Sequence, residues 1–226
     1  MCVELQVGYT AVETIKSKLR FEWMAANIGV RVHAYHMDNG IYCSDEFLKE
    51  LQAKGQGIKM SGVSAEFQNG AAESIIKSVV QSAHTMMLHA QTRWPAVADE
   101  SLWPQALQYA VYLHNIMPTE ETGVSPVEVW TRTKSNHSDL LHAHTWGSPA
   151  YVLSPRLREG GHVPKWEPRS KRGQFVGYSP LHASNVGMIR NLNTGYVSPQ
   201  FHVMYNDFFE TMHSDEGSPP SAKVWE

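Results

Sequence analysis

The chain has 226 residues, a formal net charge of −3 and a sequence pI of about 6.5. Its 42% hydrophobic and 18% charged residues are typical of a folded globular protein and exclude a disordered chain. No apolar run reaches the roughly 20 residues of a membrane span, and the first residues lack the pattern of a secretory signal. Cys2 and Cys43 cannot build a disulfide framework, which favours a reducing, intracellular compartment.

Helix-capping signals open the first part of the chain. Thr10–Glu13 has the capping-box pattern and predicts a helix that Gly29 can end. The predicted apolar face of this helix consists of Val12, Ile15, Leu19, Trp23 and Ala26. Ser44 can cap a short second helix that ends near Gly55. Between the two helices, residues 30–35 alternate as a strand, and a short strand and loop are predicted over 57–65.

A long helix is predicted to begin at Asn69 and to end before Pro95. Its apolar face comprises Ala72, Ile75, Ile76, Val79, Val80, Ala83, Met86 and Met87. A further helix is expected over 101–117, where Pro118 stops it. Ser125–Glu128 repeats the capping box with proline at the first helical position, which predicts a short helix through Trp130.

Helical spacing gives way to strand-like runs after about residue 145. These runs are 150–153, 173–178, 186–189 and 196–198. Asn193–Gly195 is a predicted hairpin connection between the last two. The second part of the chain therefore predicts a small β-barrel or sheet joined to an α/β unit, and the polar tail near the C-terminus predicts disorder.

Two acidic residues lie at the ends of predicted elements. Asp38 follows the strand over 30–35, and Glu73 falls in the first turn of the long helix. A carboxylate at a strand end and another at a helix start can converge on one divalent cation, which suits phosphoryl transfer on nucleic acid. The alternative for Asp38-Asn39-Gly40 is an ordinary turn.

Basic residues concentrate in one stretch of the second part, although the bulk charge does not favour nucleic-acid binding. The six bases are Arg156, Arg158, Lys165, Arg169, Lys171 and Arg172. Only Glu159 and Glu167 oppose them between 156 and 172, which leaves a local charge of +4 with neutral histidine. Such a patch can contact phosphates. The alternative is a solvated loop.

Motifs along most of residues 10–212 resemble, in family order, the integrases of copia-type LTR retrotransposons. In the first part the matching segments are His36–Gly40, Gly57–Val63, Phe67–Glu73, His84–Ala90, Leu102–Leu107 and Ser125–Glu128. In the second part they are Thr145–Leu153, Pro164–Ser170, Gly173–Ser179 and Val197–Val203. The resemblance covers many motifs rather than one.

The resemblance implies an α/β fold: a truncated RNase H-like core, a helical extension and a small SH3-like β-barrel domain. The expected boundaries are 1–95 for the partial core, 96–144 for the extension, 145–212 for the β domain and 213–226 for the tail. In such integrases an Asp–Asp–Glu triad binds Mg²⁺ or Mn²⁺. By resemblance, Asp38 and Glu73 are its second and third members. The first aspartate is expected upstream of Cys2–Val7, outside this chain, together with a zinc-binding domain.

The function implied by the resemblance is DNA integration by metal-dependent strand transfer, with the triad incomplete in this chain. Implied partners are retroelement DNA ends, target DNA and further copies of the chain, with no membrane partner and an expected nuclear location. Lys77 matches a DNA-contacting helix face, or is a surface partner of Glu73 at i,i+4 spacing. Alternatives are a non-catalytic nucleic-acid-binding or scaffold protein and an inert retroelement relic.

Overall fold

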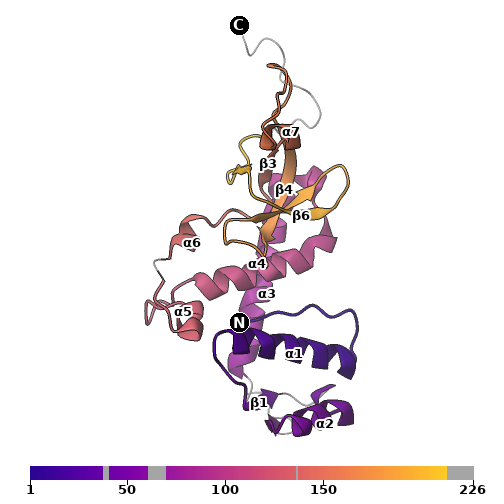
Figure 1. The fold of residues 1–226 in the computed structure, drawn as a ribbon, viewed down its shortest axis with the longest axis vertical. Coiled ribbons are helices and arrows are strands. Elements are labelled where there is room, and N and C mark those ends of the chain that lie inside the picture. Colours follow the sequence, from indigo (N-terminus) through magenta and orange to yellow (C-terminus); the bar gives the residue numbers. More distant parts are fainter. Residues whose placement is uncertain (38–40, 61–69, 136, 213–226) are drawn as a thin grey trace. The chain divides into compact units, whose positions relative to one another are not determined.

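The computed structural model describes residues 1–37, 41–60, 70–135 and 137–212 (Figure 1). The chain divides into two compact units. Unit 1 consists of residues 1–79 and 129–133, and unit 2 consists of residues 80–128 and everything from 134 onward. Asp38 and the predicted disordered tail lie outside the described residues.

Unit 1 is a small α/β assembly. Its elements are α1 (Ala11–Asn27), β1 (Ala34–Met37), the 3₁₀ turn η1 (Ile41–Cys43), α2 (Asp45–Ala53), β2 (Gly57–Met60) and the start of α3 (Gly70–Arg93). The strands β1 and β2 pair in parallel, with Ala34 opposite Gly57 and Met37 opposite Met60. Since α2 connects the two parallel strands, unit 1 contains a βαβ arrangement.

Both predicted helix starts in unit 1 are confirmed at the level of single hydrogen bonds. The Thr10 hydroxyl accepts a hydrogen bond from the Glu13 amide, and the Ser44 hydroxyl accepts one from the Phe47 amide. Gly29 follows α1 with a positive φ of 75°. Local sequence therefore places α1 and α2 correctly.

The strand prediction for 30–35 was wrong in its position. Only Ala34 and Tyr35 of that range belong to β1, which continues to Met37. The cause is the partner strand, because β2 begins at Gly57 and the ladder starts with Ala34 opposite it. Alternating polar and apolar residues predict that a strand forms, but they do not predict where it pairs with the neighbouring strand.

The predicted apolar face of α1 was also wrong. Val12, Leu19 and Trp23 are 55%, 39% and 65% exposed. The side chains of α1 that are buried instead belong to Ala11, Thr14, Lys18 and Ala25. Unit 1 does contain an apolar cluster of Met37, Phe47 and Leu51, against which Ile15 and Tyr35 pack. The buried face of α1 is partly polar, because it includes Thr14 and Lys18, and Lys18 joins a charged network with Glu22.

The long helix α3 confirms the prediction of a helix ending before Pro95, and Glu73 lies in its first turn. Asn69, the predicted N-cap, lies outside the described residues. Of the predicted apolar face, Val79 and Ala83 are buried, whereas Ile75, Ile76 and Val80 are 41%, 52% and 50% exposed. Helical periodicity therefore identified the helix but only part of its buried face.

The remaining helical segments are the 3₁₀ turns η3 (Pro95–Val97) and η4 (Glu100–Leu102), and the helices α4 (Trp103–Ile116), α5 (Pro126–Thr131), α6 (Ser138–Leu141) and α7 (Pro155–Arg158). They belong to unit 2, apart from residues 129–131, which end α5 and belong to unit 1. The second capping box is formed as predicted: the Ser125 amide donates to Glu128 Oε2 at 2.8 Å and the Glu128 amide donates to Ser125 Oγ. Backbone hydrogen bonds from Ser125 and Ser135 lower the pKa of Glu128 to about 2.

A five-stranded antiparallel sheet forms the β part of unit 2. Its strands are β3 (Pro149–Leu153), β4 (Ser170–Tyr178), β5 (Gly187–Asn191), β6 (Val197–Gln200) and β7 (Val203–Tyr205), in the order β6-β5-β4-β3-β7. Four strands match the predicted runs, and Gly195 takes a positive φ of 75° in the predicted hairpin connection. The three-residue edge strand β7 was not predicted.

The core of unit 2 lies where α4 packs against β4. Phe175 is fully buried and its ring meets those of Tyr109, Tyr178 and Tyr205. The Trp146 indole is also buried and donates to the Val176 carbonyl at 3.2 Å. Partial burial raises the pKa of the Tyr205 phenol to about 12, so it is neutral near neutral pH.

Gly147 is a position where unit 2 requires glycine. Its φ is +82°, and an added Cβ would lie 2.4 Å from the Ala90 Cβ. Gly147→Ala is expected to lower the free energy of unfolding by about 2–4 kcal/mol, from left-handed strain plus overpacking. Gly195→Ala is the matched control, because its φ is +75° with open space around the added Cβ, and should cost only about 1–2 kcal/mol. Chemical denaturation compares the two, and equal losses would contradict the packing argument.

Among the described residues, no helix combines the length and the apolar character that crossing a bilayer requires.

Candidate functional site

The predicted acidic pair is only partly within the described residues. The strand β1 ends at Met37, the residue directly before Asp38, but Asp38 itself lies outside them. Glu73 is exposed in the first turn of α3. No ion pair engages its carboxylate in the described part of the chain. Among the described residues, no three His, Cys, Asp or Glu side chains form a group that could hold a metal ion.

Lys77 lies one turn after Glu73 on α3 and is exposed. The two side chains form no ion pair in the structure, as judged over the described residues. One of the two predicted roles of Lys77, ion pairing with Glu73 at the surface, is therefore not seen in this structure. The role in contacting DNA stays a prediction.

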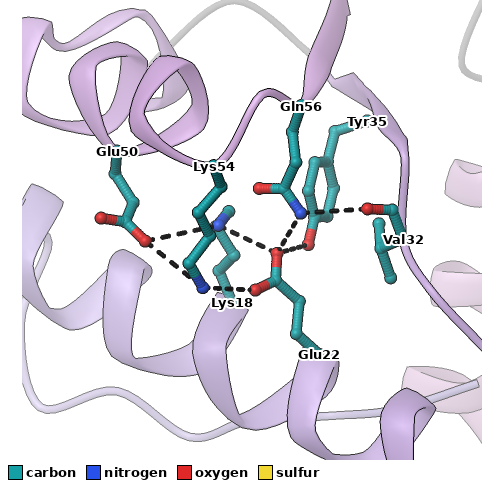
Figure 2. Close-up of polar contacts among 7 residues, drawn as sticks. All are labelled: Lys18, Glu22, Val32, Tyr35, Glu50, Lys54 and Gln56. Atoms are coloured by element: carbon teal, nitrogen blue, oxygen red, sulfur yellow. Dashed lines mark hydrogen bonds and ion pairs between the residues drawn. The ribbon is translucent and has the colours of Figure 1, made fainter.

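A network of charged and polar side chains holds β1 against the helices of unit 1 (Figure 2). Its centre is the Glu22 carboxylate of α1, which accepts a hydrogen bond from the Tyr35 hydroxyl at 2.6 Å and one from the Gln56 amide at 2.7 Å. The ammonium of Lys54, the residue directly after α2, lies 2.7 Å from Glu22 and 3.5 Å from Glu50. Tyr35 belongs to β1, so the network fixes the strand that leads to Asp38.

Lys18 completes this network from inside. Its side chain is only 3% exposed, and its ammonium lies 2.9 Å from Glu22 and 3.7 Å from Glu50. The same ammonium lies 5.7 Å from the centre of the Tyr35 ring (Figure 2). Substituting one partner of such a buried ion pair is strongly destabilising, because it leaves the other charge buried and uncompensated.

The network sets the ionisation of its members. Burial alone would raise the pKa of Glu22, but hydrogen bonds from Lys54, Tyr35 and Gln56 and the ion pair with Lys18 outweigh burial and lower the pKa to about 2. Burial and the hydrogen bond to Glu22 raise the pKa of Tyr35 well above its usual range. Near neutral pH the carboxylate is therefore ionised and the phenol neutral, an arrangement suited to holding structure rather than to exchanging protons.

A cleft of about 500 Å³ opens beside the network in unit 1, with Glu22, Arg31, His33, Lys54 and Gln56 in its wall. Glu22, Lys54 and the amide nitrogen of Gln56 bond to one another or to the Val32 carbonyl. These groups of the cleft therefore already satisfy one another. The cleft was not predicted from the sequence, because its wall combines residues of α1 with the loops before β1 and before β2.

The basic stretch of unit 2 is divided by the structure. A groove of about 200 Å³ on the sheet is lined by Arg158 of α7, Lys171 and Arg172 of β4, and polar groups that include Asn193, Ser198 and Gln200. The Arg158 guanidinium donates to Gln200 Oε1 at 3.4 Å. None of the ion pairs formed by the described residues involves Arg158 or Lys171. The groove therefore presents cations beside amide and hydroxyl groups, which together suit a phosphate.

The other predicted basic residues lie outside the groove. Arg156, Lys165 and Arg169 are exposed and do not line it. The Lys165 ammonium lies 5.2 Å from the ring centre of Trp166, which is 89% exposed. The Arg172 guanidinium lies 5.4 Å from the ring centre of the buried Trp94. The six bases therefore do not form one surface: Arg158, Lys171 and Arg172 line the groove, and the other three do not.

A polar contact in unit 2 between His144 and Asp207 was not predicted from the sequence. The Asp207 carboxylate lies 2.9 Å from His144 Nδ1 and accepts the Thr145 amide at 2.7 Å. The His144 ring stacks on Tyr205 with 3.7 Å between ring centres. The His144–Asp207 pair connects the segment before β3 to the segment after β7. These residues are too far apart in the sequence for a local pattern to predict the contact.

Comparison with known proteins gives weak likenesses. No protein-family model matches the chain. It is similar to a chain in a cryo-EM structure of the simian T-cell lymphotropic virus intasome in complex with PP2A regulatory subunit B56 gamma, at 14% identity and a TM-score of 0.41, covering 87% of this chain and 64% of that one. It is also similar to the HTLV-2 integrase catalytic core domain in complex with magnesium, at 17% identity and a TM-score of 0.35, covering 54% and 70%. This chain thus spans about 64% of the length of the intasome chain, and these TM-scores do not establish a shared fold.

Proposed function

We propose that the chain is part of an integrase of the copia-retrotransposon kind, with a partial RNase H-like core in unit 1 and an SH3-like β domain in unit 2. Its activity would be metal-dependent DNA strand transfer. The observation that carries the proposal is the position of the two acids: β1 ends directly before Asp38, and Glu73 stands exposed in the first turn of α3. The resemblance of the motifs, in order along the chain, supports the same assignment.

The metal in this proposal is Mg²⁺ or Mn²⁺, held by Asp38 and Glu73. The exposed Glu73 carboxylate fits such an ion, because hard cations prefer carboxylate oxygens. Mg²⁺ usually takes one or two carboxylates and completes its shell with water and substrate phosphates. When bound, the ion would activate a hydroxyl nucleophile and stabilise the leaving oxygen. The part of this chain is to hold the two carboxylates, and the Glu22 network positions the strand before Asp38.

The test is Mn²⁺-dependent nicking or joining of duplex DNA by a protein that also carries the upstream aspartate of the triad. Asp38→Asn and Glu73→Gln are each expected to reduce activity at least about a hundredfold, since each removes a proposed metal ligand. Glu46→Gln is the matched control: Glu46 is an exposed acid in the first turn of α2 and should leave activity unchanged. Activity that persists in either single variant would contradict the assignment of metal ligands.

The groove of unit 2 favours a second function, nucleic-acid binding without catalysis. Lys171→Ala is expected to weaken binding of duplex DNA and to lower the slope of log affinity against log salt by about 1, because one phosphate contact is lost. Lys134→Ala is the control, an exposed lysine of unit 2 that is not among the groove's lining residues. Equal effects of the two substitutions would show that the groove is not a specific contact. Binding that survives Asp38→Asn and Glu73→Gln, with no cleavage, would favour a binding or scaffold protein.

A further inference from the structure

The groove of unit 2 has an aliphatic floor. It is lined by Val152 of β3, Gly173 of β4 and Ile189 of β5, with Leu153 and Pro155 beside them. A Cβ on Gly173 would lie 2.5 Å from Ile189 Cγ2, so the isoleucine side chain lies over the glycine backbone. None of these five residues is charged. Water on such a surface is released favourably when a ligand with an apolar face covers it.

Cations and polar side chains surround this floor. Arg158 and Lys171 are exposed and form no ion pair within the described part of the chain. The Arg158 guanidinium of α7 contacts Gln200 Oε1 of β6 at 3.4 Å, so α7 and β6 meet at the groove. The described residues that line the groove include no acid. The rim therefore attracts an anion, while the floor favours an apolar surface.

One amide group on the rim is free to donate a hydrogen bond. Asn191 Oδ1 accepts the backbone amides of Asn193 at 2.9 Å and Thr194 at 3.3 Å. Asn191 Nδ2 has no partner among the described residues. By contrast, Gln200 Nε2 donates to Ser198 Oγ at 3.0 Å. The free nitrogen of Asn191 can therefore donate to a carbonyl oxygen on the edge of a base, such as those of thymine.

A DNA duplex can use only the rim of this groove. Its bases are paired and stacked inside the helix, so phosphates and sugars are what it presents to a small concave surface. An unpaired nucleotide can instead turn its base outward and place it on side chains while its phosphate meets cations. The groove, of about 200 Å³, has room for one ring system and not for a double helix.

We propose that the groove holds one unpaired nucleotide of single-stranded DNA. Its base would lie on the floor at Val152, beside Asn191, and its phosphate would contact Arg158 and Lys171. The charge of the rim and the apolar floor are then both used by one ligand. This inference rests on the nucleic-acid binding proposed above for the groove, and it names the form of DNA that the groove takes.

Fluorescence anisotropy with a thymidine single strand and a duplex of equal length tests the proposal. Val152→Phe fills the floor and leaves both cations in place, so it should weaken single-strand binding about tenfold and leave duplex binding unchanged. Met204→Phe is the matched control, because Met204 lies in β7, is 78% exposed and does not line the groove. Lys171→Ala should weaken binding of both forms, since both use the rim.

An abasic single strand, which keeps the phosphates, shows whether the base enters the groove. The unmodified chain should bind it about tenfold more weakly than the thymidine strand, and Val152→Phe should bind the two equally. A persistent difference in Val152→Phe would place the base elsewhere and overturn the proposal. Displacement of the thymidine strand by polyglutamate as readily as by more of the strand would assign the groove to acidic peptides instead.

The same measurements separate this inference from the function on which it rests. Duplex binding that Lys171→Ala weakens, with no effect of Val152→Phe on either form of DNA, would overturn the single-strand site alone. Failure of the unmodified chain to bind any DNA would overturn both.

Photo-crosslinking covers the case in which Val152→Phe fails to fold. A single strand that contains 4-thiothymidine, irradiated with the unmodified chain, should label Val152 or residues 187–200, which mass spectrometry of the peptides identifies. Labelling confined to other segments would overturn the proposal.

Discussion

Replacing Glu22 with glutamine is expected to destabilise unit 1 by about 3 kcal/mol, because it leaves the buried Lys18 ammonium without its nearest carboxylate. The remaining acid, Glu50, lies 3.7 Å away and already faces Lys54. Hydrogen exchange at the amides of α1 and α2 gives the free energy of local opening in unit 1. Glu13→Gln is the control on the same helix, since the exposed pair of Glu13 and Lys16 should contribute less than about 1 kcal/mol.

The same network predicts an acid dependence of stability. The folded-state pKa of Glu22 is about 2, below the ordinary value of 4.5, so its contribution is fully present above 4.5 and is lost as the pH falls from 4.5 toward 2. The unmodified chain should lose protection of α1 and α2 in that window, and Glu22→Gln should lose much less. Parallel acid curves for the two proteins would show that Glu22 is not the group responsible.

Phe175→Ala is expected to lower the free energy of unfolding of unit 2 by about 4 kcal/mol. Its ring is fully buried among three tyrosines, and the truncation leaves a cavity beneath α4. Phe201→Ala removes the same side chain from a position that is 58% exposed and should cost less than about 1 kcal/mol. Near-ultraviolet circular dichroism during denaturation follows the tyrosine cluster directly. Similar losses for the two variants would contradict the placement of the core at Phe175.

Local patterns in the sequence predicted the elements of this chain better than the faces they bury. The caps at Thr10, Ser44 and Ser125 were correct because each is a hydrogen bond within three residues. The face of α1 was not predicted, because Val12, Leu19 and Trp23 have the spacing of a core while the structure buries Lys18. Burial of that lysine depends on Glu22 and on residues of α2 and β1, and no window of the sequence contains this set.

The candidate sites show the same division. Glu73 was correctly placed in the first turn of a helix, because N-terminal helix signals are local. The six bases of the stretch 156–172 were predicted as one contact, but only Arg158, Lys171 and Arg172 line the groove. Arg156, Lys165 and Arg169 do not line it. Which bases come together depends on the register of β4 with its neighbouring strands, which no local pattern in the sequence contains.

Binding of Mn²⁺, followed by electron paramagnetic resonance in the presence of duplex DNA ends, tests most directly whether Asp38 and Glu73 share one cation. We expect saturable binding that either Asp38→Asn or Glu73→Gln weakens by at least about tenfold, while Glu46→Gln leaves it unchanged. Equal Mn²⁺ affinity in all four proteins would contradict the shared site, and with it the assignment of metal-dependent strand transfer to this chain.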